Sequence, residues 1–158
     1  MRVLGIDFGE SRIGLAVSDP TGTLARPLRT ISPRGSLAER ASAVGAEVSK
    51  MLMESGESDL GAVVVGFPRS LSGAEQQQTE RVLAFVDALR ASIPLPVLLQ
   101  DERLSSVEAE QRLAICESDW RKRKTRLDAA SAAVILQDFL DQKIRDNDQK
   151  PGKTVGGC

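Results

Sequence analysis

The order of strand-like and helix-like segments constrains the fold of this chain more than any other feature. Three strand-like segments come first, at residues 2–7, 12–18 and 23–31, and the turn Asp19-Pro20-Thr21-Gly22 separates the second from the third. Short turns join neighbouring antiparallel strands, so this opening predicts an antiparallel meander. Pro27 has no N–H to donate within a sheet, which favours an edge position for the third strand.

The middle of the chain alternates between helical and strand-like segments. A helix from Ser36 to about Glu54 precedes the run Val63-Val64-Val65, and a helix from about Gly73 to Arg90 precedes Val97-Leu98-Leu99. Continuous apolar runs are typical of buried parallel strands, whereas the alternation in 12–18 indicates a half-buried strand. Right-handed crossovers place the fourth strand beside the first and the fifth beside the fourth. We therefore predict an α/β fold with a five-stranded mixed sheet, three antiparallel strands followed by two parallel ones, flanked by helices.

The C-terminal third carries two further helical patterns. A capping box at Ser105-Ser106-Val107-Glu108 predicts a short helix to about Cys116, and the last helix is expected to start near Leu127. The apolar stripe of this last helix ends at Ile144, and the chain is polar from about Arg145. These patterns predict a single domain over residues 1–144 and a disordered polar tail over residues 145–158.

The composition excludes several kinds of chemistry. The 158 residues include 21 Lys and Arg against 22 Asp and Glu, which gives a net charge of −1, and they include no His and only two Cys. Catalysis by Ser-His-Asp or Cys-His, zinc sites with His or four Cys, and a disulfide scaffold are therefore excluded or disfavoured. Because no apolar stretch is long enough for a signal peptide or a membrane span, we expect a cytoplasmic protein with no membrane partner.

Three carboxylates are the strongest candidates for chemistry. Asp7 ends the first strand, Glu102 follows the fifth, and Asp128 is expected in the first turn of the last helix. The carboxyl ends of strands one, four and five meet at one edge of the predicted sheet, where α/β folds place their sites. Strand alternation points Asp101 and Glu102 to opposite sides, so only one of them can face Asp7. Taken singly, the three acids also fit a turn residue, a solvated strand end and a helix cap.

A metal ion would explain why three carboxylates share one edge. Mg²⁺ or Mn²⁺ prefers hard oxygen ligands and would relieve the repulsion among the acids. Two such ions can activate a water and stabilise the leaving oxygen of a phosphodiester without any His. The basic run Arg121-Lys122-Arg123-Lys124-Thr125-Arg126 stands directly before Asp128. Its cations would contact phosphates that flank the cut, unless the run is only a solvated loop.

Five motifs, taken in order, resemble the YqgF family. They are Gly5–Gly9, Arg12–Asp19, Gly66–Pro68, Asp101–Ser106 and Asp128–Gln137, and the resemblance covers about residues 1–142. It implies an RNase H-like fold related to the RuvC Holliday junction resolvases. It also implies that Asp7, Glu102 and Asp128 form the acidic triad that holds the divalent metal, with Glu102 preferred over Asp101. Our candidate nucleic-acid contacts are the cations near these acids, Arg12, Arg103, Arg121, Lys122, Arg123, Lys124 and Arg126.

The family resemblance implies a metal-dependent nuclease that matures the 5′ end of pre-16S rRNA. Two alternatives stay open: a DNA nuclease of the Holliday junction resolvase type, and a non-catalytic RNase H-like module that binds nucleic acid. An ATPase or sugar kinase of the actin-like class is disfavoured because it needs two such domains, and 158 residues hold only one. The expected partners are precursor rRNA, branched DNA and pre-ribosomal particles, and the expected assembly is a monomer or a homodimer.

Overall fold

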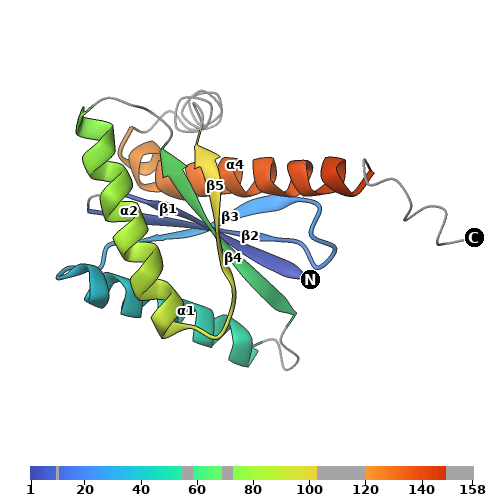
Figure 1. Cartoon of the computed structure of the whole chain (residues 1–158), viewed down its shortest axis with the longest axis horizontal. Helices are drawn as coiled ribbons and strands as arrows, with labels where there is room; N and C mark the ends of the chain where they lie inside the picture. Colours follow the sequence, from blue (N-terminus) through green and yellow to red (C-terminus); the bar gives the residue numbers. More distant parts are fainter. Residues whose placement is uncertain (10, 55–58, 69–72, 103–119, 149–158) are drawn as a thin grey trace, which may run out of the picture.

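The computed structural model describes residues 1–9, 11–54, 59–68, 73–102 and 120–148 (Figure 1). Within these ranges the strands are β1 (Arg2–Phe8), β2 (Ile13–Ser18), β3 (Ala25–Ile31), β4 (Leu60–Pro68) and β5 (Val97–Glu102). The helices are α1 (Leu37–Glu54), α2 (Gly73–Ser92) and α4 (Trp120–Asp148). The short helix predicted from Ser105 lies outside the described residues.

All five strands form one mixed sheet in the order β3-β2-β1-β4-β5. β1 pairs antiparallel with β2, and β2 pairs antiparallel with β3, whereas β1–β4 and β4–β5 are parallel. The predicted topology is therefore confirmed, and so is the edge position of the strand that carries Pro27. Helices α1 and α2 cover one face of the sheet, and α4 crosses the other face (Figure 1).

The two faces of β1 belong to different parts of the core. Leu4, Ile6 and Phe8 pack into the larger hydrophobic cluster with α1 and α2, whereas Val3 packs with α4. Gly5 allows α4 to come close, because a Cβ at this position would lie 2.7 Å from the Cβ of Leu136. Residues 3, 5 and 7 of a strand share one face. The alternation therefore assigns Asp7 to the face that α4 covers.

Two strands differ from prediction in how deeply they are buried. β2 was expected to be half-buried, but all six of its residues are buried, because α4 covers the face that carries Gly14 and Ala16. β5 was expected to be a buried strand, yet Leu98 and Leu99 are 40% and 38% exposed. β5 is the last strand of the sheet, so only β4 flanks it, and the prediction of a fully buried strand was wrong.

The last helix is longer than predicted at both ends. It begins at Trp120 rather than near Leu127, and it ends at Asp148, beyond the start of the predicted tail. The basic run is thus helical, which agrees with the good helix propensity of Arg and Lys. Asp128 was expected in the first turn, with a helix cap as the alternative, and both are wrong, since Asp128 lies in the helix interior. On the expected apolar stripe Ala129, Leu136 and Leu140 are buried and Ala133 is partly buried, but Ile144 is 42% exposed.

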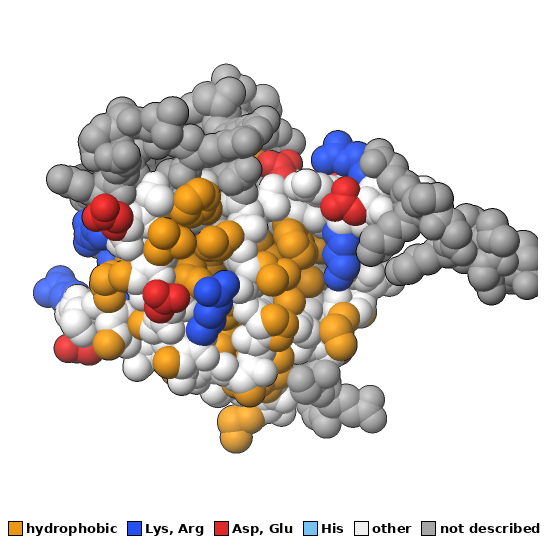
Figure 2. Space-filling model, viewed as in Figure 1, with side chains coloured by type: hydrophobic (Ala, Val, Ile, Leu, Met, Phe, Trp, Pro, Cys, Tyr) orange, Lys and Arg blue, Asp and Glu red, His pale blue; other side chains and the backbone are white. Residues whose placement is uncertain are grey.

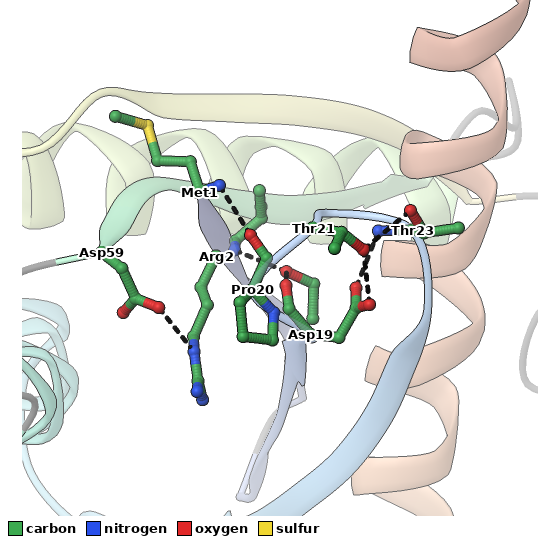
Figure 3. Close-up of polar contacts among 9 residues, drawn as sticks. Met1, Arg2, Asp19, Pro20, Thr21, Thr23 and Asp59 are labelled. Carbon is green, nitrogen blue, oxygen red and sulfur yellow. Dashed lines mark hydrogen bonds and ion pairs between the residues drawn. The ribbon is translucent and has the colours of Figure 1, made fainter.

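Polar contacts fix the end of the sheet where the chain begins (Figure 3). The N-terminal amine donates to the carbonyl of Pro20 at 2.8 Å, and Arg2 pairs with Asp59 at 2.8 Å. Asp19 accepts hydrogen bonds from the Thr21 hydroxyl and from backbone N–H groups of the β2–β3 turn. These bonds, that of Thr21 first, lower the pKa of Asp19 from 3.8 to about 2. The turn is therefore held by a carboxylate that prefers its ionised form.

The described surface mixes charge and hydrophobic groups. Figure 2 shows acidic and basic side chains scattered among hydrophobic ones on the face that carries α1 and α2. Among the described helices, none is long and apolar enough to cross a membrane.

Candidate active site

Asp7 is the next-to-last residue of β1 and lies at the carboxyl end of the strand. Its partner across the antiparallel ladder is Gly14 of β2. Residues directly opposite in such a pair share a face of the sheet, so Asp7 and Gly14 both belong to the face that α4 covers. Asp7 is half-buried there.

Asp128 of α4 lies above Gly14. A Cβ at Gly14 would overlap the backbone carbonyl oxygen of Asp128, so the helix rests directly on β2 at this point. The side chain of Asp128 is 24% exposed, and its Oδ2 lies 3.3 Å from Nε of Arg12. The Gly14 position thus brings Asp7 and Asp128, which are 121 positions apart, to neighbouring places on one face of the sheet.

Glu102 occupies the end of β5, two strands away from β1. The parallel register pairs Asp101 with Phe67 and Glu102 with Pro68. Position 97 packs toward α1 and α2, since Val97 belongs to the larger cluster. Alternation along the strand gives that face positions 97, 99 and 101, and gives the α4 face positions 98, 100 and 102. The register agrees with this assignment, since Leu98 pairs with Val64, which packs in the cluster of α4.

The predicted cations fall into three groups. Arg12 lies beside the candidate site and pairs with Asp128. Arg121, Lys122, Arg123, Lys124 and Arg126 belong to the first two turns of α4, directly before Asp128. Arg103 lies outside the described residues. Within the described part of the chain, no group of three acidic, His or Cys residues forms a ready metal cluster.

Arg40 is a residue of this region that the sequence did not single out. It is only 4% exposed, and its Nη2 donates to the carbonyl oxygen of Gly9 at 2.5 Å. Its guanidinium carbon lies 4.4 Å from the centre of the Phe8 ring. The sequence did contain a pattern that could have identified Arg40. Positions 40, 44 and 48 share one face of α1, and positions 44 and 48 are core valines. A cation on the apolar stripe of a helix is unusual, and here Phe8 and Gly9 hold it in place.

The geometry supports chemistry with oxygen ligands. Asp7 and Asp128 share a face, and the strand position of Glu102 belongs to the same face. Such an arrangement is able to hold a hard divalent cation, and Arg12 supplies a positive charge beside it. The same edge carries the basic run, so a polyanion could approach with its phosphates near the acids.

Comparisons with known proteins show which family and which solved structure this chain is similar to. A family model described as "RuvX: Holliday junction resolvase" matches residues 1–142. A protein of Pelotomaculum thermopropionicum named "Putative pre-16S rRNA nuclease" is 36% identical over 157 residues, which is 99% of this chain and 97% of that protein. Relatives of the same name from Roseiflexus and Chloroflexus aggregans are 39% and 40% identical, over 90% and 89% of this chain and 95% and 94% of theirs.

One solved structure is similar enough for its fold to be compared with that of this chain. Thermus thermophilus RuvC in complex with a Holliday junction substrate matches with a TM-score of 0.52 and 22% sequence identity, over 91% of this chain and 96% of that one. At this level of identity the match shows the fold. The RNase H-like fold expected from the sequence is confirmed by this match and by the strand order of the sheet.

Proposed function

Because this chain belongs to the RuvX (YqgF) family, we propose that it is a divalent-metal-dependent endonuclease that matures the 5′ end of pre-16S rRNA. The family description and the names of the relatives supply the reaction class, hydrolysis of a phosphodiester bond. Relatives of the same name match across nearly their whole length, which supports carrying this activity to the present chain.

The observation that best supports a catalytic role is the meeting of Asp7 and Asp128 across Gly14. One acid comes from the first strand and the other from the last helix. We assign Asp7, Glu102 and Asp128 as the acidic triad. The register of β5 supports Glu102 over Asp101, because position 102 belongs to the α4 face and position 101 to the opposite one.

The donor set fits a hard cation. Asp7, Glu102 and Asp128 offer only oxygen, and the chain has no His to favour a softer metal. These three residues would hold Mg²⁺ or Mn²⁺, which when bound activates a water and stabilises the charge of the leaving oxygen. A bound cation would also relieve the mutual repulsion of the three carboxylates.

Arg12 has a positioning role in this proposal. Its Nε lies 3.3 Å from Oδ2 of Asp128, so it holds that carboxylate at the edge of β2. A guanidinium has five N–H donors in a planar fork, and one pair with Asp128 leaves others for a phosphate of the substrate. Arg12 thereby connects the acidic site with the nucleic acid. Arg103, Arg121, Lys122, Arg123, Lys124 and Arg126 complete the proposed contacts to phosphates.

The proposal is tested by incubating the full chain with Mg²⁺ or Mn²⁺ and three substrates. These are a precursor rRNA fragment that spans the 5′ end of 16S rRNA, an unrelated single-stranded RNA, and a four-way DNA junction. We expect cleavage of the precursor near the mature end, and loss of cleavage in EDTA. Cleavage of the junction alone would favour the resolvase alternative, and binding without any cleavage would favour the non-catalytic module.

Substitutions of the acids test the assignment of the site. Asp7→Asn, Glu102→Gln and Asp128→Asn should each abolish cleavage, since removing a ligand of a two-metal site removes activation of the water. Asp101→Asn is the matched control and should keep much of the activity. A dead Asp101→Asn together with an active Glu102→Gln would show that the other acid of this pair is the ligand.

The proposed substrate indicates the compartment and the partners of the protein. A nuclease of precursor rRNA acts in the cytoplasm, with pre-ribosomal particles as partners, and as a monomer or a homodimer. Sedimentation of cell extracts would show the protein with pre-ribosomal particles if this part of the proposal holds, and only in the free fractions if it does not.

A further inference from the structure

A pocket lined by arginines lies next to the candidate active site. Its volume is about 450 Å³. Its walls are formed by residues of the β1–β2 turn, the β3–α1 loop, α1 and α2. The polar residues that line it are Ser11, Arg12, Ser32, Arg34, Arg40 and Arg81. No Asp or Glu is among the described residues of its lining, although the Glu39 carboxylate packs against Gly35 at its border. The described lining therefore carries four arginines and no carboxylate.

Arg40 is built into the wall of this pocket rather than attached to the surface. Its side chain is held by the carbonyl of Gly9 and by the ring of Phe8, which in turn stacks on Phe85 at 4.4 Å. Within the described part of the chain its buried Nε makes no hydrogen bond. A buried donor without a partner is costly, so the structure holds Arg40 in the wall of the pocket at a cost in stability.

The charges of the pocket are not balanced by its described lining. Burial, and then the charge of Arg81, lower the pKa of Arg40. Arg12 has Asp128 as its counter-ion, but Arg34 and Arg40 form no ion pair with a described acid. Guanidinium groups around one hollow repel each other, and an anion in the hollow would relieve this repulsion. The fork of each guanidinium matches the oxygens of a phosphate, which favours phosphate over a smaller anion.

The position of the pocket relates it to the proposed reaction. Arg12 belongs both to the pocket, which it lines, and to the candidate active site, where it pairs with Asp128. Arg40 binds the carbonyl of Gly9, two residues after Asp7. A strand of nucleic acid whose scissile phosphate lies at the acids would thus have a neighbouring phosphate within reach of the pocket.

We propose that the pocket formed by Arg12, Arg34, Arg40 and Arg81 binds a non-scissile phosphate of the substrate strand and so fixes which bond reaches the acids. This inference rests on the proposed nuclease function, and it adds a binding subsite on the α1 and α2 side of the sheet. The basic run of α4 would hold the strand on the other side.

Binding measured in EDTA separates this subsite from cleavage. The full chain is titrated with single-stranded RNA and with the precursor fragment, and the variant Arg34→Gln/Arg81→Gln changes two exposed arginines of the pocket. We expect binding to weaken about tenfold or more, as loss of charge-assisted contacts to phosphate predicts. The slope of log K against log salt should also become shallower by about 0.7 for each lost contact. Arg26→Gln, an exposed arginine of β3 outside the pocket, is the control and should bind like the wild type.

Arg40 is tested by Arg40→Lys, which keeps the charge but removes the planar fork. Thermal unfolding establishes that this variant is folded, and its binding should fall with that of the double variant. Equal RNA affinity in wild type, the double variant and Arg40→Lys would overturn the proposal. A second result would also overturn it. In that case the wild type binds inorganic phosphate or a nucleoside monophosphate tightly, and the double variant loses this binding but keeps its RNA affinity. The pocket would then bind a free anion and not the RNA strand.

The outcomes also separate this inference from the proposed function. Wild-type protein that binds RNA through the pocket but cleaves nothing with Mg²⁺ or Mn²⁺ would refute the nuclease and leave the subsite in place. Protein that cleaves the precursor at the same site and rate in the double variant would keep the nuclease and refute the subsite.

Discussion

The backbone carbonyl of Asp128 lies directly over Gly14, at a distance that leaves no room for a Cβ. Gly14 is also the ladder partner of Asp7. One glycine therefore sets the spacing between the first strand's acid and the last helix's acid. Its lack of a side chain lets α4 approach the sheet closely enough for both carboxylates to share a site.

Gly14→Ala tests this spacing. The added methyl group would overlap the backbone of α4, so we expect a loss of about 1–3 kcal/mol in the free energy of unfolding, as for other overpacked sites. Cleavage should fall as well, because Asp128 moves away from Asp7. Urea unfolding and cleavage rates measure the two effects.

Gly45→Ala is the matched control for that substitution. A Cβ at Gly45 of α1 would lie 3.7 Å from the side chains of Ile93 and Ser92, an ordinary contact. Alanine is the better helix former, so this variant should gain about 0.5–1 kcal/mol and cleave normally. Wild-type stability and activity in Gly14→Ala would contradict the close approach.

Neutralising an acid tests the shared site without substrate. Asp7→Asn nearly conserves volume and removes repulsion, so in EDTA the variant should be as stable as the wild type or more stable, by up to about 1–2 kcal/mol. Mg²⁺ or Mn²⁺ at a hundredfold excess over Kd should stabilise the wild type by about 2.7 kcal/mol, and the variant much less. Thermal melts of both proteins, with metal and with EDTA, measure this. A variant that is destabilised in EDTA and responds to metal like the wild type would rule out the shared site.

Because the basic run is helical, its contacts to RNA can be tested with two pairs of residues that lie on different faces of α4. Positions 121 and 124 lie seven and four residues before Asp128, on the same face of α4, whereas positions 122 and 123 lie on other faces. Arg121→Gln/Lys124→Gln should therefore weaken RNA binding and flatten its salt dependence by about 0.7 for each lost phosphate contact. Lys122→Gln/Arg123→Gln removes the same charge and should have the smaller effect. Equal effects of the two pairs would indicate a general attraction by charge.

Asp19 predicts a pH dependence of stability. Its pKa is about 2 in the folded chain, below its ordinary value of 3.8, so the folded state favours the ionised carboxylate. The stabilisation is fully present above about pH 4 and disappears as the pH falls through about 2. The difference in urea stability between wild type and Asp19→Asn should therefore shrink over this range. Thr21→Val removes the hydroxyl that contributes most, so NMR titration should show a higher pKa for Asp19 in that variant.

Local patterns were sufficient for the order of the elements. Runs such as Val63-Val64-Val65, the turn at Asp19 and the N-cap at Ser36, whose Oγ accepts from the backbone N–H of Glu39 at 3.2 Å, act over a few residues. Handedness of the crossovers then leaves one strand order, the one observed. Asp7 and Asp128 could be named as candidates because strand ends and helix faces follow from the same patterns.

The tertiary structure decided what depends on contacts between distant segments. Gly14 belongs to an ordinary alternating strand, and only the position of α4 shows that it carries the helix that holds Asp128. Arg40 belongs to an amphipathic helix, and its significance appears only when Phe8, Gly9 and Arg81 surround it. The start of α4 was predicted near Leu127 but lies at Trp120, because the helix continues through the basic run, whose Arg and Lys have good helix propensity. A sequence specifies local preference over a few residues, whereas close approach, burial and convergence of charge arise only when the whole chain packs.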